Sequence, residues 1–303
     1  MNVQENVPMS SYTSCKVGGP ARYFVKTESK EDLLASLEFA KSKKIPYFVL
    51  GNGTNLLISD KGFNGLIIVL GKSFSEIQDL GNGKFQVGAA ASLGSFARKT
   101  IKWSMLGLHK LGGIPGTLGG AIYMNAGAYG VEIANCCTQV NSIDVAGNLK
   151  TRTGVECNFG YRKSIFQEIS TNPEAAEIIL SATFQLSPGD TAVMEQELAE
   201  CMAKRKATQP LNKPNAGSTF KRLEIGAKET PQQIAPGYYI EQAGLKGFRM
   251  GGAEVSTLHA NFIVNAGGAT ASDIKNLSEY IQKVVAKKFG VQLKREIILL
   301  GEF

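Results

Sequence analysis

The sequence lacks residues and spacings that several common protein classes require. Only two histidines are present and the five cysteines include no CxxC spacing, so we expect no metal site. The longest apolar runs, such as 65–70, have the length of a strand, so we expect no membrane-spanning helix. Residues 1–15 contain neither a basic cluster nor an apolar core, so we expect no signal peptide.

Motifs of nucleic-acid binding are missing too. The 33 Lys and Arg residues against 26 Asp and Glu residues give a net charge of +7, but they form no RNP, helix-turn-helix or zinc-finger framework. Much of the excess follows residue 206. It suits a phosphate-bearing small ligand or an ordinary solvated basic surface, and we expect neither a nucleic-acid nor a membrane partner.

The cysteines form an odd set, which is typical of reduced thiols in a cytosolic protein. They are Cys15, Cys136, Cys137, Cys157 and Cys201. The adjacent Cys136 and Cys137 are a candidate redox pair, but neighbouring cysteines are geometrically poor partners for an unstrained disulfide. We therefore expect free thiols that act as small hydrophobic residues, in a cytoplasmic protein.

At 303 residues, the chain exceeds the size at which one core usually stops growing, so two or three domains are expected. Apolar periodicity and turn residues predict an α+β protein. The predicted strands are 22–27, 47–50, 66–70, 85–89, 142–145, 149–153, 178–186, 218–221, 262–264 and 297–300. The predicted helices are 29–43, 190–206 and 273–289.

Helix ends and faces can be predicted in detail. Ser29 is the expected N-cap of the first helix, and Ser272 and Gly290 are the expected N-cap and stop of the third. The expected inward face of the second helix comprises Val193, Leu198, Cys201 and Met202. A linker, QPLNKPNAG, follows that helix, so we place a domain boundary near residue 205.

Two glycine-rich loops dominate the sequence, GNGTN at 51–55 and GGIPGTLGG at 112–120. Because glycine lets backbone amides approach a pyrophosphate without a side-chain clash, both loops are candidates to bind an anionic cofactor. Neither matches the GxGxxG or GxxxxGK[ST] fingerprint, and each alone is also typical of a tight turn at a domain corner. The segment YMNAGAYG at 123–130 continues the small-residue pattern, which suits a flat prosthetic group lying against backbone.

Seven segments spread over nearly the whole chain carry a resemblance to a known family. They include GIPGTLGGAIYMNAGAYG and, in order along the chain, SYTSCKVGGPA, VLGNGTNLLISDKGF, GYRKSIF, PNAGSTFKR, GLKGFRMGGAEVSTLHANFIVN and FGVQLKREI. Together they resemble the UDP-N-acetylenolpyruvoylglucosamine reductases, and the first is similar to the flavin-binding signature of that family. The short interval between GYRKSIF and the strand at 178 resembles the subtype that lacks an extra substrate-covering loop.

The resemblance implies an architecture and an activity. FAD-binding subdomains of the vanillyl-alcohol-oxidase-like type are expected at 1–71 and 72–205, and an α+β substrate-binding domain at 206–303. The implied reaction is reduction of UDP-N-acetylglucosamine enolpyruvate to UDP-N-acetylmuramate, a cytoplasmic step of peptidoglycan precursor synthesis. FAD is expected to be non-covalent, with NADPH as co-substrate, and the protein is expected to be a monomer.

The resemblance also implies binding residues. Those expected to bind FAD are Gly51, Asn52, Gly53, Thr54, Asn55, Gly112, Gly113, Ile114, Pro115, Gly116, Thr117, Gly119, Gly120, Asn125, Ala126 and Gly127. Those expected on the substrate side are Tyr161, Lys221 and Gln242. Thr54 replaces the usual Ser and keeps the hydroxyl, whereas Arg222 replaces the usual Asn and is better suited to a phosphate.

The family's catalytic positions correspond to Arg162, Ser218 and Glu296. Reduction of an enolpyruvyl ether places a hydride on the terminal vinyl carbon and a proton on the neighbouring carbon, with enolate-like charge between these events. Arg162 would hold that charge, and Ser218 would deliver the proton with help from Lys221. Glu296 would orient or partly protonate the enol, with the adjacent Arg295 facing away if the segment is a strand.

Two other interpretations stay open. An oxidase of the same fold would use oxygen, and His109 is a candidate for covalent flavin attachment, although a structural role is the simpler expectation for this residue. His259 is expected to order local backbone. A non-catalytic nucleotide-sugar or nucleic-acid binding protein would share the charge and the glycine loops, but a flavin absorption band would exclude it.

Overall fold

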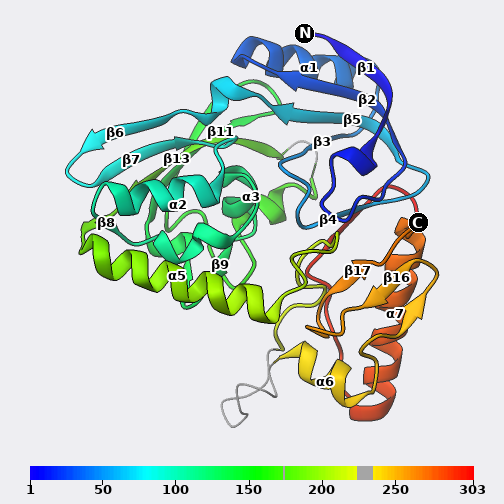
Figure 1. Cartoon of the computed structure of the whole chain (residues 1–303). Helices are drawn as coiled ribbons and strands as arrows, with labels where there is room; N and C mark the ends of the chain where they lie inside the picture. Colours follow the sequence, from blue (N-terminus) through cyan, green and yellow to red (C-terminus); the bar gives the residue numbers. More distant parts are fainter. Residues whose placement is uncertain (173–174, 224–234) are drawn as a thin grey trace. The chain divides into compact units, whose positions relative to one another are not determined.

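The structure is a computed structural model and describes residues 1–172, 175–223 and 235–303 (Figure 1). These residues divide into two compact units. Unit 1 comprises Met1–Gln4, Phe24–Gly51 and Gly65–Arg205, and unit 2 comprises Glu5–Tyr23, Asn52–Asn64 and Lys206–Phe303. The three-domain division expected from the sequence stays a prediction.

A four-stranded sheet contains, in order, β1 (Val3–Pro8), β2 (Pro20–Thr27), β5 (Phe63–Leu70) and β3 (Tyr47–Val49). The strands β3 and β5 run parallel. Helix α1 (Lys30–Ser42) follows β2 and begins at the predicted cap, because Ser29 Oγ accepts the Asp32 N–H at 3.1 Å. Its apolar face is buried through Leu33 and Leu37, as its periodicity predicts.

The main sheet of unit 1 is antiparallel and five-stranded. Its order is β12 (Leu149–Thr153), β11 (Cys137–Asp144), β13 (Glu177–Gln185), β7 (Lys84–Gly88) and β6 (Ile77–Gly81). Helices α2 (Leu93–Lys102) and α3 (Leu118–Tyr123) lie on one side of it, with α5 (Thr191–Thr208) beyond them (Figure 1). Phe85, Phe96 and Phe184 are buried between sheet and helices, with the rings of Phe96 and Phe184 5.4 Å apart.

Short elements connect these layers and carry much of the glycine-rich sequence. They are η1 (Met9–Ser11), η2 (Lys72–Ser75), β8 (Met105–Leu106), η3 (His109–Gly113), β9 (Gly127–Ala128), β10 (Val131–Glu132), η4 (Ile133–Asn135), α4 (Ile165–Ile169) and β14 (Ser187–Pro188).

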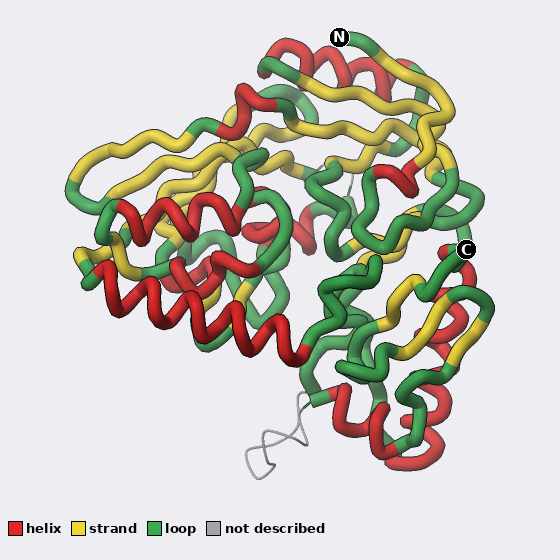
Figure 2. Tube along the Cα trace, viewed as in Figure 1, coloured by secondary structure: helices red, strands yellow, loops and turns green. Residues whose placement is uncertain are grey.

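Unit 2 is built around one long helix. Helix α7 (Ala271–Phe289) packs across β15 (Arg249–Met250), β16 (Ala253–Val255) and β17 (Ile263–Asn265), and α6 (Pro236–Gln242) packs on α7. Figure 2 shows α7 beside these short strands, with loops between them. Strands β4 (Leu56–Ile58) and β18 (Ile298–Leu300) pair in parallel. The helical spacing predicts an inward face of Ile274, Leu277, Ile281, Val284 and Val285, and all of these are buried except Val284, which is partly buried.

Three local predictions were wrong. Thr270, not Ser272, caps α7, because its Oγ1 accepts the Asp273 N–H. On α5, Val193 is 54% exposed and Met194 is buried, because the apolar residues there fit two helical phases. Residues 218–221 form no strand, since only Phe220 pairs, in an isolated bridge with Arg295.

Within the described ranges, no helix combines the length and the apolar character needed to cross a bilayer.

All five cysteines are free thiols, as predicted. Burial raises the pKa of Cys137 to about 12 and that of Cys157 to about 11, so neither thiol is activated as a nucleophile.

Candidate active site

Arg162 occupies a tight turn in unit 1. Gly160 and Lys163 exchange two backbone hydrogen bonds, of 3.0 and 3.1 Å, so Tyr161 and Arg162 are the two residues at the tip. Arg162 has φ +53°, in the left-handed region that disfavours a side chain as large as arginine. Its guanidinium lies over the Tyr161 ring, 5.0 Å from the centroid, and donates to Gly127 O at 2.7 Å. The predicted catalytic arginine is therefore anchored on a segment predicted to bind the flavin.

Asn125 joins the turn that contains Arg162 to segment 123–130, which is predicted to bind the flavin. Its side chain is buried, and Nδ2 donates to Gly160 O and to Glu132 Oε2, each at 2.9 Å. Its Oδ1 accepts the Ala134 N–H at 3.0 Å. Asn125 was predicted as a cofactor residue, but its side chain is used in contacts within the protein. Its backbone is used there too, because its N–H donates to Ile122 O at 3.1 Å and its carbonyl accepts from Arg162 Nη1 at 3.4 Å.

The second glycine loop is fixed from within. Thr117 forms an isolated bridge with Ser92, and Thr117 Oγ1 accepts the Gly120 N–H at 3.3 Å. Gly116 has φ +132°, which requires glycine. Gly120 is exposed, and a Cβ placed on it would meet only Thr117 Oγ1 within 4 Å. A rigid loop with bare backbone at its surface fits a flavin nucleotide that lies against the chain.

The first glycine loop begins against the second one. A Cβ on Gly51 would lie 2.5 Å from Thr117 Oγ1, so within unit 1 these two predicted cofactor residues are in contact and a side chain at position 51 would push them apart. The other residues of the first loop, Asn52–Asn55, belong to unit 2. There Gly53 has φ +59°, and a Cβ on it would lie 2.1 Å from Tyr12 O, so the fold itself requires this glycine.

Arg205 is a candidate cofactor residue that the sequence analysis missed. A Cβ on Gly113 would lie 3.4 Å from Arg205 Cδ, so the half-buried side chain passes the second glycine loop. Burial lowers the pKa of Arg205, while the neighbouring Tyr129 acts in the opposite direction. A guanidinium in this position can pair with a phosphate. The available signal was helical spacing, since Arg205 follows Leu198 and Met202 on the same face of α5.

In unit 2, the segments that carry Ser218, Lys221 and Glu296 run side by side. Thr219 O accepts the Glu296 N–H at 2.8 Å, and the Lys221 N–H donates to Lys294 O at 2.9 Å. The structure therefore places the segment of Ser218 and Lys221 beside the segment of Glu296, which is far away in the sequence. Arg295 points elsewhere, because its Nη1 donates to Ser278 Oγ of α7 at 3.2 Å.

Residues 259–262, with the sequence HANF, hold this pair of segments in place. Asn261 Oδ1 accepts the Phe220 N–H at 3.1 Å and Asn261 Nδ2 donates to Phe220 O at 2.9 Å. The Asn261 N–H donates to His259 Nδ1 at 3.2 Å, so His259 orders local backbone as expected. Burial, and then the charge of Lys246, lowers the pKa of His259, so its ring is neutral at pH 7.

Other predicted residues lie outside these clusters. Gln242, predicted on the substrate side, is exposed at the end of α6, where its carbonyl accepts from Lys288 Nζ. His109 is 2% exposed and its Nε2 lies 2.7 Å from Glu197 Oε2, which is a structural environment.

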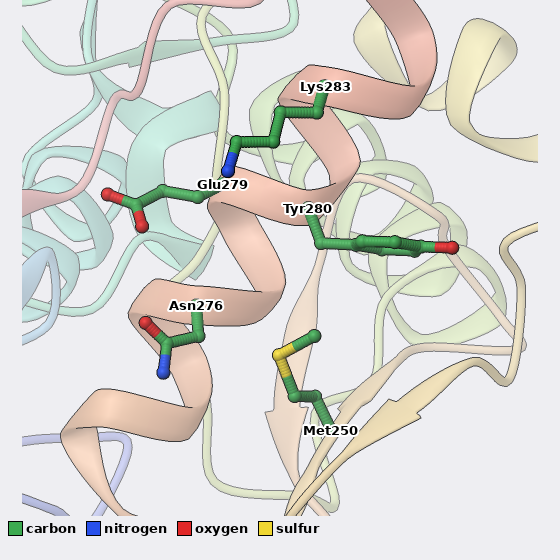
Figure 3. Close-up of a pocket in the computed structure, with 5 residues that line it drawn as sticks. All are labelled: Met250, Asn276, Glu279, Tyr280 and Lys283. Carbon is green, nitrogen blue, oxygen red and sulfur yellow. The ribbon is translucent and has the colours of Figure 1, made fainter.

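Figure 3 shows a pocket of about 350 Å³ beside α7. It is lined by Met250, Asn276, Glu279, Tyr280 and Lys283, none of which is a predicted site residue.

Family models identify the class of protein first. Residues 21–152 match the model of an FAD binding domain, and residues 209–300 match the model of the C-terminal domain of UDP-N-acetylenolpyruvoylglucosamine reductase. Together with the glycine loops, these matches define an FAD-binding oxidoreductase with an α+β fold, as predicted.

Individual relatives define the family. The chain is 42% identical to the UDP-N-acetylenolpyruvoylglucosamine reductase of Caldanaerobacter subterraneus subsp. tengcongensis, covering 98% of this chain and 93% of that one. It is 40% identical to that of Lactobacillus delbrueckii subsp. bulgaricus, covering 100% and 96%. The crystal structure of the reductase from Thermus caldophilus is similar with a TM-score of 0.81 at 32% identity, covering 99% and 100%. The chain belongs to the UDP-N-acetylenolpyruvoylglucosamine reductase family.

Proposed function

We propose that this enzyme reduces UDP-N-acetylglucosamine enolpyruvate to UDP-N-acetylmuramate with NADPH, in the formation of peptidoglycan precursors. The observation that carries the proposal is the pairing of segments 218–221 and 294–296 in a chain of this family. The two segments carry a hydroxyl, an ammonium and a carboxylate, which are the groups needed to protonate a carbon next to a carboxylate. When bound, FAD supplies the chain with a hydride carrier between NADPH and the terminal vinyl carbon.

In this proposal, each catalytic residue has one task. Arg162 pairs with the substrate carboxylate and stabilises the negative charge that develops during reduction. Ser218 delivers the proton to the carbon that bears the ether oxygen. Lys221 lies three residues further along, and its positive charge stabilises the negative charge that the Ser218 oxygen carries after it gives up its proton. Glu296 orients the enol.

The flavin-binding residues are proposed to act mainly through backbone. Gly116 and Gly120 leave room for the cofactor to approach, and Thr117 keeps the loop rigid by capping α3. Arg205 is proposed to pair with a cofactor phosphate. Tyr161, Lys221 and Gln242 are proposed to contact the substrate.

We also propose that the enzyme works as a monomer in the cytoplasm. Five free thiols are compatible with a reducing compartment. The reductant NADPH is itself a small diffusible molecule, so the proposed reaction needs no partner protein. Light scattering during gel filtration measures the oligomeric state directly.

The proposed function is tested by separating the two halves of the reaction. Under anaerobic conditions, NADPH should bleach the flavin absorption band of the purified enzyme, and the enolpyruvyl substrate should restore it. UDP-N-acetylglucosamine, which lacks the enolpyruvyl group, is the control and should restore nothing. Mass spectrometry should find a product two hydrogen atoms heavier than the substrate. Restoration that is faster with oxygen than with the enolpyruvyl substrate would instead indicate an oxidase.

A further inference from the structure

Ser14 makes two contacts in unit 2 that the proposed mechanism does not use. It lies in the N-terminal block SYTSCKVGGPA, and its N–H donates to Gly53 O at 3.0 Å. Its Oγ lies 2.6 Å from Asn215 O and 3.2 Å from Gly53 O. Because a serine hydroxyl has one hydrogen, the shorter contact identifies Asn215 O as its main acceptor. Ser14 thus joins the first glycine loop to the loop that leads to Ser218.

Asn215 determines how the chain enters Ser218. Its Oδ1 accepts the Gly217 N–H at 2.9 Å, and its Nδ2 donates to Lys213 O at 2.8 Å. Gly217 has φ +80°, so the chain turns sharply just before Ser218. These bonds fold residues 213–217 around the Asn215 side chain. A displacement of Asn215 is therefore transmitted to Ser218 within three residues.

The same glycine loop also holds the backbone of the Glu296 segment. Asn55 Nδ2 donates to Glu296 O at 3.1 Å, and Asn55 O accepts the Ile298 N–H at 3.0 Å. Residues 53–55 therefore contact the Ser218 loop through Ser14 and the Glu296 segment through Asn55. Asn55, predicted to bind the cofactor, has its side chain turned to the protein.

We propose that Ser14 is a positioning residue that fixes Ser218 relative to the glycine loop. The inference rests on the proposed function, in which Ser218 delivers a proton. Proton transfer to carbon requires close approach along a defined direction, and a misplacement of about 1 Å can slow a reaction by about 100-fold. Ser14 acts through Asn215, because its hydroxyl donates to Asn215 O. Its removal should affect the second half-reaction and spare the first.

The test compares Ser14→Ala, which removes the hydroxyl, with Ser14→Thr, which keeps one. Ser11→Ala is the matched control, because Ser11 is an exposed serine in the same N-terminal segment. In stopped-flow experiments, Ser14→Ala should reoxidise with the enolpyruvyl substrate about 10–100-fold more slowly than wild type, with NADPH reduction unchanged. Ser14→Thr should recover most of the rate, and Ser11→Ala should match wild type.

A second measurement uses the flavin-bound enzyme without nicotinamide or substrate. Amide hydrogen exchange of Gly217 should become about 10-fold faster in Ser14→Ala, while exchange of buried α7 amides such as that of Ile281 stays unchanged. Equal acceleration at both places would mean general destabilisation and would overturn the positioning role. A wild-type reoxidation rate in Ser14→Ala would also overturn it. If the wild-type enzyme itself fails to couple NADPH to the enolpyruvyl substrate, the proposed function fails first, and the exchange result still decides whether Ser14 holds the loop.

Discussion

Arg162 holds a backbone conformation that is unfavourable for an arginine. A non-glycine residue in a sparsely populated region costs about 1–3 kcal/mol, and such residues cluster where function requires them. The two bonds between Gly160 and Lys163 and the anchor on Gly127 O compensate for that cost. Glycine would fit the φ of +53° better, so the fold alone does not explain the arginine. The strained residue is expected to be the one that binds the developing charge.

Substitution Arg162→Lys tests that role. Lysine keeps the charge but loses the planar fork that pairs with a carboxylate. The activation free energy of reoxidation by the enolpyruvyl substrate should therefore rise by roughly 2–4 kcal/mol, which slows this step about 30–1,000-fold. Flavin content, measured from the absorption spectrum, should stay near that of wild type. A variant with full flavin and wild-type turnover would remove Arg162 from the mechanism.

Substitution Ser218→Ala separates proton delivery from hydride supply. Loss of a positioned proton donor costs about 10²–10⁴-fold, so reoxidation by substrate should slow by that factor in stopped-flow measurements. NADPH should still reduce the flavin at nearly the wild-type rate, because Ser218 lies outside the glycine loops. Equal slowing of both steps would indicate a flavin-positioning role. Unchanged reoxidation would show that another group, with Glu296 as the first candidate, delivers the proton.

At the scale of elements, the start of α7 offers a matched pair of substitutions. Thr270 and Asp273 form a capping box, with Asp273 N–H donating to Thr270 Oγ1 and Thr270 N–H donating to Asp273 Oδ2, both at 3.0 Å. Thr270→Ala should lower the free energy of unfolding by about 1 kcal/mol in urea titrations. Ser272→Ala should change it by less than half as much, because the exposed Ser272 contributes only its backbone N–H, to Asp60 Oδ2. The reverse order would mean that Ser272 is the effective cap.

Strand β16 carries a buried carboxylate whose titration should be visible in stability. The Glu254 side chain is 5% exposed and accepts from Arg249 Nε at 2.7 Å and from Lys213 Nζ at 3.3 Å. Burial raises the pKa of Glu254, but the hydrogen bonds and positive charges of Arg249 and Lys213 together outweigh burial and leave the pKa below its usual value of 4.5. A lowered pKa means that the carboxylate stabilises the fold above about pH 4.5 and that this contribution is lost as the pH falls further.

Glu254→Gln should therefore flatten the acid side of the stability curve. Urea unfolding between pH 3 and 7 should give a smaller loss of free energy on acidification in the variant than in wild type, although the variant should be less stable at pH 7. Equal slopes would show that other carboxylates control the acid response. Asp273 is the next candidate, because the Thr270 N–H lowers its pKa and its contribution is also lost at low pH.

Elements with long periodic patterns could be predicted and irregular ones could not. Residues 273–289 show clear helical spacing and a glycine stop, and α7 has that extent plus two residues. The 218–221 segment has the composition of a strand, but Asn261 takes the hydrogen bonds of Phe220 that a neighbouring strand would take. The phase of α5 was ambiguous because Val193 and Met194 are both apolar and only tertiary packing chooses between them.

At the scale of the whole molecule, the predicted site residues were identified only through their motif contexts. Arg162, Ser218 and Glu296 are ordinary residue types whose spacing alone indicates nothing. The contacts that hold these segments could not be predicted from the sequence. Ser14 contacts Asn215, and Asn55 contacts Glu296, across about two hundred residues or more. A single sequence carries no signal for such pairs, because neither partner belongs to a local pattern.

The last prediction concerns how the whole chain retains its cofactor. The contacts that the glycine loops offer are non-covalent and depend on the folded backbone, so unfolding should release every flavin. His109, the one candidate for a covalent link, is 2% exposed and paired with Glu197, so its ring is enclosed by protein.

Acid precipitation should leave all yellow colour in the supernatant, and the denatured chain should have the mass of the polypeptide alone. His109→Ala is the control and should release its flavin in the same way as wild type. Colour in the wild-type pellet, together with a mass increase of one flavin that disappears in His109→Ala, would contradict non-covalent binding. That outcome would favour the oxidase alternative, because covalent attachment occurs in some oxidases of this fold.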